Sequence, residues 1–185
     1  MKRKAARKTG LSEKARREIT GLLLLAAAFL LLLSFFASAG LVGDYLNLAG
    51  KWLFGAGRFL LPFYLGALAI IYFYHSKPEA LESVAMGGGL IIIAVLVGTH
   101  LQLKQEDVFK TPLIFHYGGL IGAGLSGLLR LLIGVTGSYV LAVTGVLIGL
   151  VYLTGVSLTD VGSKVVNFWR ARKKPKPLKS ATKPR

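Results

Sequence analysis

The stretch YGGLIGAGLSGLLRLLIGVTGS, residues 117–138, decides how many times this chain crosses a membrane. It is apolar enough to enter lipid, yet it has six glycines before Thr136 and a cation at Arg130. A membrane span needs roughly 20 mainly apolar residues, and 118–134 supplies only about 17. A crossing here would also place Arg130 in or near lipid, which is costly. We therefore predict that 118–134 is an outer-face helix that lies on the membrane or inserts halfway.

The side chains of this segment divide into two faces at helical spacing. Gly122, Ser126 and Arg130 recur at intervals of four residues on one face. The larger side chains share a broad apolar face, which consists of Leu120, Ile121, Leu125, Leu128, Leu132 and Ile133. This division predicts an interfacial helix that packs against the last membrane span.

Four other segments are long and apolar enough to cross a hydrocarbon core that is about 30 Å thick. They are residues 19–40, 52–75, 84–103 and 137–158. The chain has 185 residues and a mean hydropathy of +0.61, which is too apolar for a soluble domain of this size. We predict an all-α integral membrane protein whose four-span domain covers 19–158.

The net charge of +15 is concentrated at the two ends of the chain. Residues 1–18 carry eight basic and two acidic residues, and residues 160–185 carry nine basic residues and Asp160. Four spans place both basic ends on the cytoplasmic face, which is the orientation that positively charged flanks favour. Five spans would send one basic end outward. We therefore predict a basic cytoplasmic tail at 1–18 and the start of a basic cytoplasmic linker at 159–185.

Two alternatives for the ends of the chain stay open. The basic start, the apolar run from Leu22 to Phe36 and Ala37-Ser38-Ala39 are also similar to a signal peptide with its cleavage site, although the apolar run is long for one. The basic tails could also bind DNA through phosphate contacts. Orientation in the membrane and attraction to anionic lipid account for the same charges, so membrane lipid is the first partner expected.

The sequence has no recognisable catalytic pattern. It lacks a phosphate-binding G-x-x-x-x-G-K-[ST] loop, a G-x-S-x-G motif, an H-E-x-x-H motif and cysteine. His75, His100 and His116 fall near predicted helix ends, and His75 is expected on the face opposite the other two, so a shared three-ligand metal site is not expected. We predict interfacial positions for these histidines. No catalytic residue, cofactor or metal is expected in this chain.

Arg58 is the only charge inside a predicted span, six residues or about 9 Å beyond Trp52. At that depth its long side chain can extend to the outer surface, or it can pair with a carboxylate such as Asp44. An intramembrane charge can also mark a conduction path. We favour a structural role for Arg58 over a conduction path.

Small residues recur along the last span at Ser138, Ala142, Gly145 and Gly149. A stripe of this kind lets two helix backbones approach closely, either within one chain or between subunits. Gly87-Gly88-Gly89 in the third span has the same two interpretations. We predict that these residues pack helices together.

The glycines of 117–138 and the end of the last span form an ordered set of motifs. A GG-x-x-G start is followed by an apolar helix, a glycine break, a final span and a TG-x-S-L close. The residues at these places are Gly118, Gly119, Gly122, Gly134, Gly137, Thr154, Gly155, Ser157 and Leu158. This order resembles the N-terminal four-span membrane domain of FtsK/SpoIIIE-type bacterial DNA translocases. The basic start and His100-Leu101-Gln102-Leu103 are most similar to the sporulation-type branch of Gram-positive bacteria.

The resemblance implies a domain that anchors, helps to assemble and localises a hexameric ATP-driven motor at the division septum. In that family the motor, with its ATP and Mg²⁺, lies beyond a linker and moves chromosomal DNA, whereas this sequence stops at Arg185. We therefore expect an anchor fragment or a stand-alone homologue without enzyme activity. It would lie in the bacterial cytoplasmic membrane as a homo-oligomer, with septal proteins as further partners. A small oligomeric channel or transporter subunit is the alternative function.

Overall fold

The computed structural model describes residues 12–36, 40–74, 78–156 and 163. The chain divides into two units, Met1–Leu153 and Thr154–Arg185, and the membrane-spanning elements belong to the first. Within the described ranges every regular element is a helix, and four helical segments are long and apolar enough to cross a membrane. The predicted all-α membrane fold is therefore confirmed.

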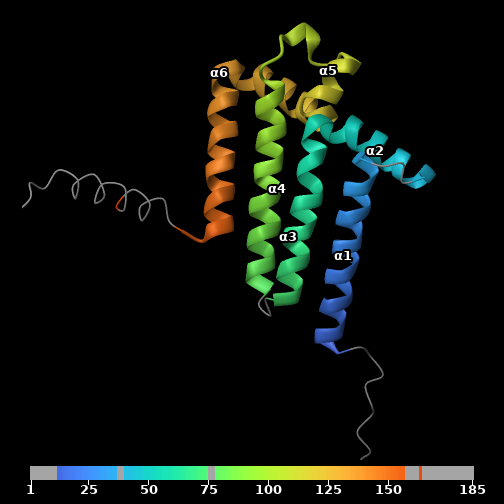
Figure 1. Ribbon diagram of the computed structural model, residues 1–185. Coiled ribbons are helices and arrows are strands. Elements are labelled where there is room, and N and C mark those ends of the chain that lie inside the picture. Colours follow the sequence, from blue (N-terminus) through green and yellow to red (C-terminus); the bar gives the residue numbers. More distant parts are fainter. Residues whose placement is uncertain (1–11, 37–39, 75–77, 157–162, 164–185) are drawn as a thin grey trace, which may run out of the picture. The chain divides into compact units, whose positions relative to one another are not determined.

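Four helical segments of the first unit run alongside one another (Figure 1). They are α1 (Glu13–Phe36), α3 (Leu60–Tyr74), α4 (Pro78–His100) and the later part of α6 (Gly119–Thr154). Contacts join α1 to α3 and α3 to α4, and close backbone approaches join α4 to α6. We call the end at which α1 and α4 finish and α3 begins the junction end. The opposite end is the tail end.

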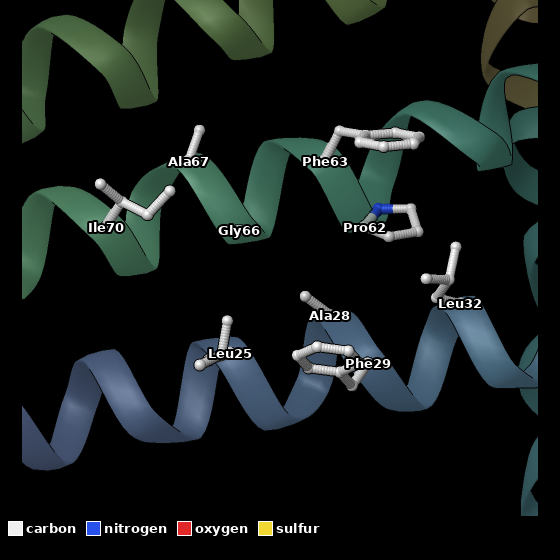
Figure 2. Close-up of a pocket in the computed structure, with 9 residues that line it drawn as sticks. All are labelled: Leu25, Ala28, Phe29, Leu32, Pro62, Phe63, Gly66, Ala67 and Ile70. Carbon is white, nitrogen blue, oxygen red and sulfur yellow. The ribbon is translucent and has the colours of Figure 1, made fainter.

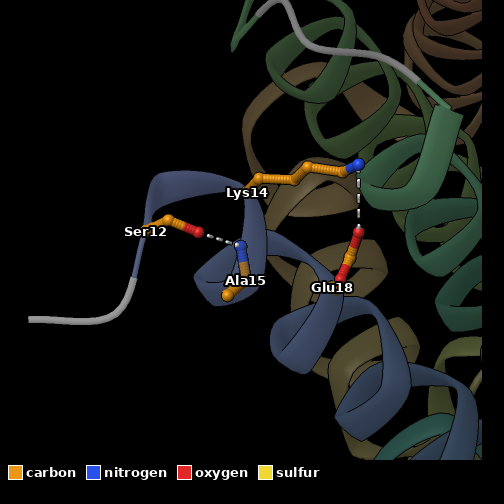
Figure 3. A network of polar contacts seen from close by, with 4 residues as sticks. All are labelled: Ser12, Lys14, Ala15 and Glu18. Atoms are coloured by element: carbon orange, nitrogen blue, oxygen red, sulfur yellow. Dashed lines mark hydrogen bonds and ion pairs between the residues drawn. The ribbon is translucent and has the colours of Figure 1, made fainter.

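The start of α1 is set by a capping hydrogen bond. The hydroxyl oxygen of Ser12 accepts the backbone N–H of Ala15 at 3.1 Å, as Figure 3 shows. The exposed ion pair between Lys14 and Glu18, at 3.9 Å, follows one turn later. The cap starts the helix at Glu13, six residues before the predicted span, so the basic tail contributes the first turns of α1.

The chain between α1 and α3 differs from the prediction, which started the second span at 52. Helix α2 (Gly40–Phe54) runs across the junction end, and a 3-10 turn, η1 (Gly55–Phe59), leads from it into α3 (Figure 1). Gly55 has a φ of 56°, and a Cβ there would collide with the carbonyl oxygen of Tyr117. Glycine therefore permits a turn that a side chain would block. Trp52, the predicted start of the second span, lies in α2 instead.

Helix α2 is an interfacial element that the sequence analysis did not predict. Its buried residues are Gly43 and Gly50, whereas Leu41, Val42 and Tyr45 are more than two-thirds exposed. Helix α2 thus packs its small face on the protein and leaves its apolar side chains exposed on the outside of the domain.

Helix α6 is divided by a non-helical residue, Gly134, with φ 72° and ψ 177°. The part before Gly134 lies across the junction end, and the part after it runs alongside α4 (Figure 1). In the first part Gly122 and Ser126 are buried, whereas Leu131 and Leu132 are largely exposed. The break falls between the predicted interfacial helix at 118–134 and the last span predicted from 137. The span itself ends at Thr154 rather than 158.

The small-residue stripe of α6 packs against α4 of the same chain. A Cβ on Gly149 would stand 2.7 Å from the carbonyl oxygen of Gly87, and a Cβ on Gly145 would stand 3.2 Å from the Cβ of Ala94. Ser138 and Ala142 of the stripe are both buried. Gly87 therefore allows close approach of α6.

On its other side, α4 receives a side chain from α3. The ring of Tyr64 lies against Gly88, 2.6 Å from where a Cβ would stand, and its hydroxyl donates to the carbonyl of Ala85 at 2.8 Å. Neighbouring glycines of α4 thus serve two different helix contacts.

We expect Gly149→Ala to lower the free energy of unfolding in detergent by about 1–3 kcal/mol, because the new methyl group must displace the Gly87 backbone or Ile91. The matched control is Gly124→Ala on the same helix, where a Cβ meets nothing within 4 Å. That substitution should leave stability unchanged or raise it by up to about 1 kcal/mol. Equal effects of the two substitutions would contradict the α4–α6 packing.

Candidate functional site

The described residues contain no group of three or more His, Cys, Asp or Glu placed to hold a metal ion. Polar side chains gather instead at the junction end, where the chain leaves α4, passes through η2 (Gln105–Asp107) and α5 (Thr111–His116), and enters α6. His100, at the last residue of α4, is completely buried there. His100 lies at a helix end, as predicted, but its complete burial was not predicted. His116 is exposed, and His75 lies outside the described residues.

Both ring nitrogens of His100 have backbone partners. The N–H of Gly118 donates to Nδ1 at 3.0 Å, so Nδ1 carries no proton. The proton is on Nε2, which donates to the carbonyl of Val108 at 3.0 Å. One neutral imidazole therefore ties two points of the segment after α4 to the end of α4.

Arg130 closes the same segment from α6. One of its terminal nitrogens donates to the carbonyl of His100 at 3.1 Å and to that of Leu103 at 2.6 Å. These carbonyls belong to the end of α4 and the residues just after it, where a helix leaves acceptors without internal partners. The predicted polar face of residues 118–134 thus turns toward the protein and caps α4.

Four glycines bring three backbones together around His100. At Gly118 a Cβ would collide with the carbonyl of Leu96, and at Gly119, which has a φ of 66°, with the carbonyl of Leu53. A Cβ on Gly122 would stand 2.6 Å from the Leu96 oxygen. The fourth glycine, in η1, lets the N–H of Ala56 donate to the carbonyl of Tyr117 at 2.8 Å. We call His100, Arg130, Gly55, Gly118, Gly119 and Gly122 the junction site.

The remaining motif glycines shape α6. Gly134 provides the break, and a Cβ on Gly137 would stand 3.1 Å from the Cβ of Ile133, which lies just before that break. Gly155 has a φ of 63° directly after Thr154, the last residue of the helix, which is the usual position of a helix-ending glycine. Ser157 and Leu158 lie outside the described residues.

Arg58 lies in the η1 turn at the start of α3, not six residues inside a straight span. Its guanidinium carbon is 4.7 Å from the centre of the Phe59 ring and 5.5 Å from that of Phe35, and these rings meet edge to face. Stacking on aromatic rings holds a cation without a carboxylate partner. The suggested pairing with Asp44 is therefore replaced by an aromatic clamp that joins the end of α1 to the α2–α3 corner.

An apolar groove of about 340 Å³ lies between α1 and α3, and Figure 2 shows side chains from both helices around it. None of the residues that line it is charged. The groove could therefore accommodate an apolar group, but its lining contains no catalytic group. Its lining consists of Leu25, Ala28, Phe29, Leu32, Pro62, Phe63, Gly66, Ala67 and Ile70.

Sequence reasoning missed two components of the junction site, His100 and Gly55. The signals for His100 were a lone histidine at the end of an apolar run and its place in His100-Leu101-Gln102-Leu103, which resembles the translocase family. Gly55 lies within a predicted span, where glycine is common and carries no position-specific signal. Their roles depend on contacts with Gly118 and Tyr117, which are far along the chain.

A helical domain with four segments long and apolar enough to span a membrane belongs to the class of multi-pass membrane proteins. The family described as the 4TM region of DNA translocase FtsK/SpoIIIE matches residues 37–166. That match covers more than half of the chain and includes the junction site. The chain therefore belongs to the FtsK/SpoIIIE four-span family.

Individual relatives agree with this assignment. The chain is 25% identical to a DNA translocase FtsK of Caldanaerobacter subterraneus subsp. tengcongensis over 170 residues, which cover 86% of this chain and 24% of the relative. It is 27% identical to a DNA translocase FtsK of Oceanobacillus iheyensis over 175 residues, covering 83% and 22%. The chain thus spans about a quarter of the length of these curated relatives. No solved structure matches it.

We expect His100→Ala to cost about 2–5 kcal/mol of unfolding free energy, because it leaves the Gly118 N–H and the Val108 carbonyl buried without partners and opens a cavity. The control is His116→Ala, since His116 is exposed and its ring bonds only to the carbonyl of Pro112 nearby. That variant should change stability by less than about 0.5 kcal/mol. A His100→Ala protein as stable as His116→Ala would show that the hydrogen bonds of the junction site do not stabilise the fold.

Proposed function

We propose that this chain is the membrane anchor and assembly domain of a DNA translocase that acts at the division septum during chromosome segregation. The observation that carries the proposal is the membership of the four-span family together with a fold in which α1 begins and α6 finishes at the tail end. In this arrangement a motor that follows α6 in the chain would lie on the same side of the membrane as the start of α1. No catalysis is assigned to the chain itself.

Charge gives the orientation of the anchor. The two ends of the sequence carry 17 of the 23 Lys and Arg residues, eight in 1–18 and nine in 160–185. Basic flanks stay on the cytoplasmic side, so both ends of the chain would be cytoplasmic in the bacterial inner membrane. The motor, with its ATP and Mg²⁺, would lie in the part of such translocases that this chain does not cover, and chromosomal DNA would be engaged there.

Assembly into a homo-oligomer, a hexamer in the family pattern, is the second part of the proposal. The helices follow one another in the order α1, α3, α4, α6, and only a small share of each apolar window is buried within the chain, 11–33%. Such helices keep broad faces for lipid or for further copies. Septal division proteins would dock on the same assembly.

A fusion of the full chain to a fluorescent protein at its C-terminus should collect as a band at midcell in dividing rod-shaped bacteria. A full-length translocase fused in the same way is the positive control, and an unrelated four-span membrane protein is the negative control. Fluorescence spread evenly around the membrane, in cells whose positive control reaches the septum, would contradict the septum-localising role. It would leave the family membership intact.

A further inference from the structure

A second cavity, of about 370 Å³, opens at the tail end between α1 and α3. It is separate from the apolar groove and is lined by Glu13, Arg16, Arg17, Thr20 and Tyr72. Its volume lies within the range of about 300–1,000 Å³ that small-molecule sites occupy. We call it the tail-end cavity.

The position of these side chains follows from helical spacing. Residues 13, 16, 17 and 20 lie on one face of α1, because three- and four-residue intervals bring side chains together. Lys14 pairs with Glu18 on another face, so this pair is not part of the cavity. Two guanidinium groups against one carboxylate give the lining a net charge of +1. The positive end of the α1 dipole adds to it.

The cavity lies where the chain passes from polar to apolar. Leu23 and Leu30 follow Arg16 at seven-residue intervals, on the same side of α1, and their side chains are exposed by 66% and 54%. On α3 the ring of Phe73, next to Tyr72, packs against Gly21 at 3.1 Å from where a Cβ would stand. A ligand in the cavity therefore has cations beside it and exposed leucines just past it, as a lipid at the membrane surface requires.

We propose that the tail-end cavity binds the phosphate-bearing headgroup of an anionic phospholipid. Arginine suits phosphate because its planar group presents several N–H donors to two oxygens at once. The Tyr72 hydroxyl is a further donor, and tyrosine is typical of the membrane interface. The acyl chains would lie along the exposed leucines of α1. Free phosphate can make the same hydrogen bonds as the headgroup, but it has no acyl chain to contact those leucines.

The test is native mass spectrometry of the purified full chain released from micelles that contain equal amounts of dioleoyl phosphatidylglycerol and dioleoyl phosphatidylcholine. The wild-type chain should retain phosphatidylglycerol in preference to phosphatidylcholine. Arg16→Gln should lower that preference at least about ten-fold, because it removes a hydrogen bond between two charged groups. Tyr72→Phe, which changes no charge and little volume, should lower it about three-fold through the lost hydrogen bond.

Lys14→Gln is the matched control, since it removes the same charge two residues away, on another side of α1 and outside the cavity. It should lower the preference by no more than about five-fold, the diffuse effect of one cation near an anionic surface. A fall equal to that of Arg16→Gln would show diffuse attraction to a basic helix and overturn the proposal. Equal retention of the two lipids by the wild-type chain would also overturn the proposal. An unchanged lipid preference in Tyr72→Phe would do the same. Displacement of phosphatidylglycerol by excess inorganic phosphate would assign the site to free phosphate instead of lipid.

Discussion

A backbone N–H or carbonyl that leaves a helix near the hydrocarbon region needs a partner from the protein, since lipid offers none. At the junction end two side chains supply such partners. The ring of His100 pairs with the N–H of Gly118 and the carbonyl of Val108. Arg130 satisfies two more carbonyls at the end of α4. The turn from α4 into α6 exists because these four backbone groups are paired.

That turn determines the path of the rest of the chain. Because Gly118, Gly119 and Gly122 have no side chains, the start of α6 can lie directly on the backbones of α4 and of the α2–η1 corner. The first part of α6 then continues across the junction end until Gly134 lets the helix change direction. Helix α2 makes the equivalent crossing between α1 and α3. Both crossing helices use small residues inward and apolar residues outward, so they lie on the domain instead of passing through it.

Elements that depend on a pattern within one short stretch of sequence were predicted correctly. Elements that depend on contacts between distant residues were not predicted. Apolar run length was enough for the four spans, and the small-residue spacing of 138–149 identified a face that does pack, on α4. The bend at Gly134 was readable because glycines and Arg130 interrupt an otherwise apolar helix. Helix α2 was not predicted, since its apolar side chains face outward and its buried face is only Gly43 and Gly50. Arg58 was placed inside a span because nothing local indicates the turn at Gly55, where the N–H of Ala56 donates to the carbonyl of Tyr117, 61 positions further along the chain.

Residues 119–133 lie across one end of the domain, and with this arrangement the chain would cross the membrane an even number of times. The sequence contains no cysteine, so each single-cysteine variant carries one thiol. Cysteines placed separately at Lys14, Lys104 and Val156 would be exposed to a membrane-impermeant maleimide, first in intact spheroplasts and then after permeabilisation. Position 104 should react in intact spheroplasts, and positions 14 and 156 should react only after permeabilisation. Labelling of 14 and 156 from opposite sides would mean that the first part of α6 crosses the bilayer, and the account would be wrong.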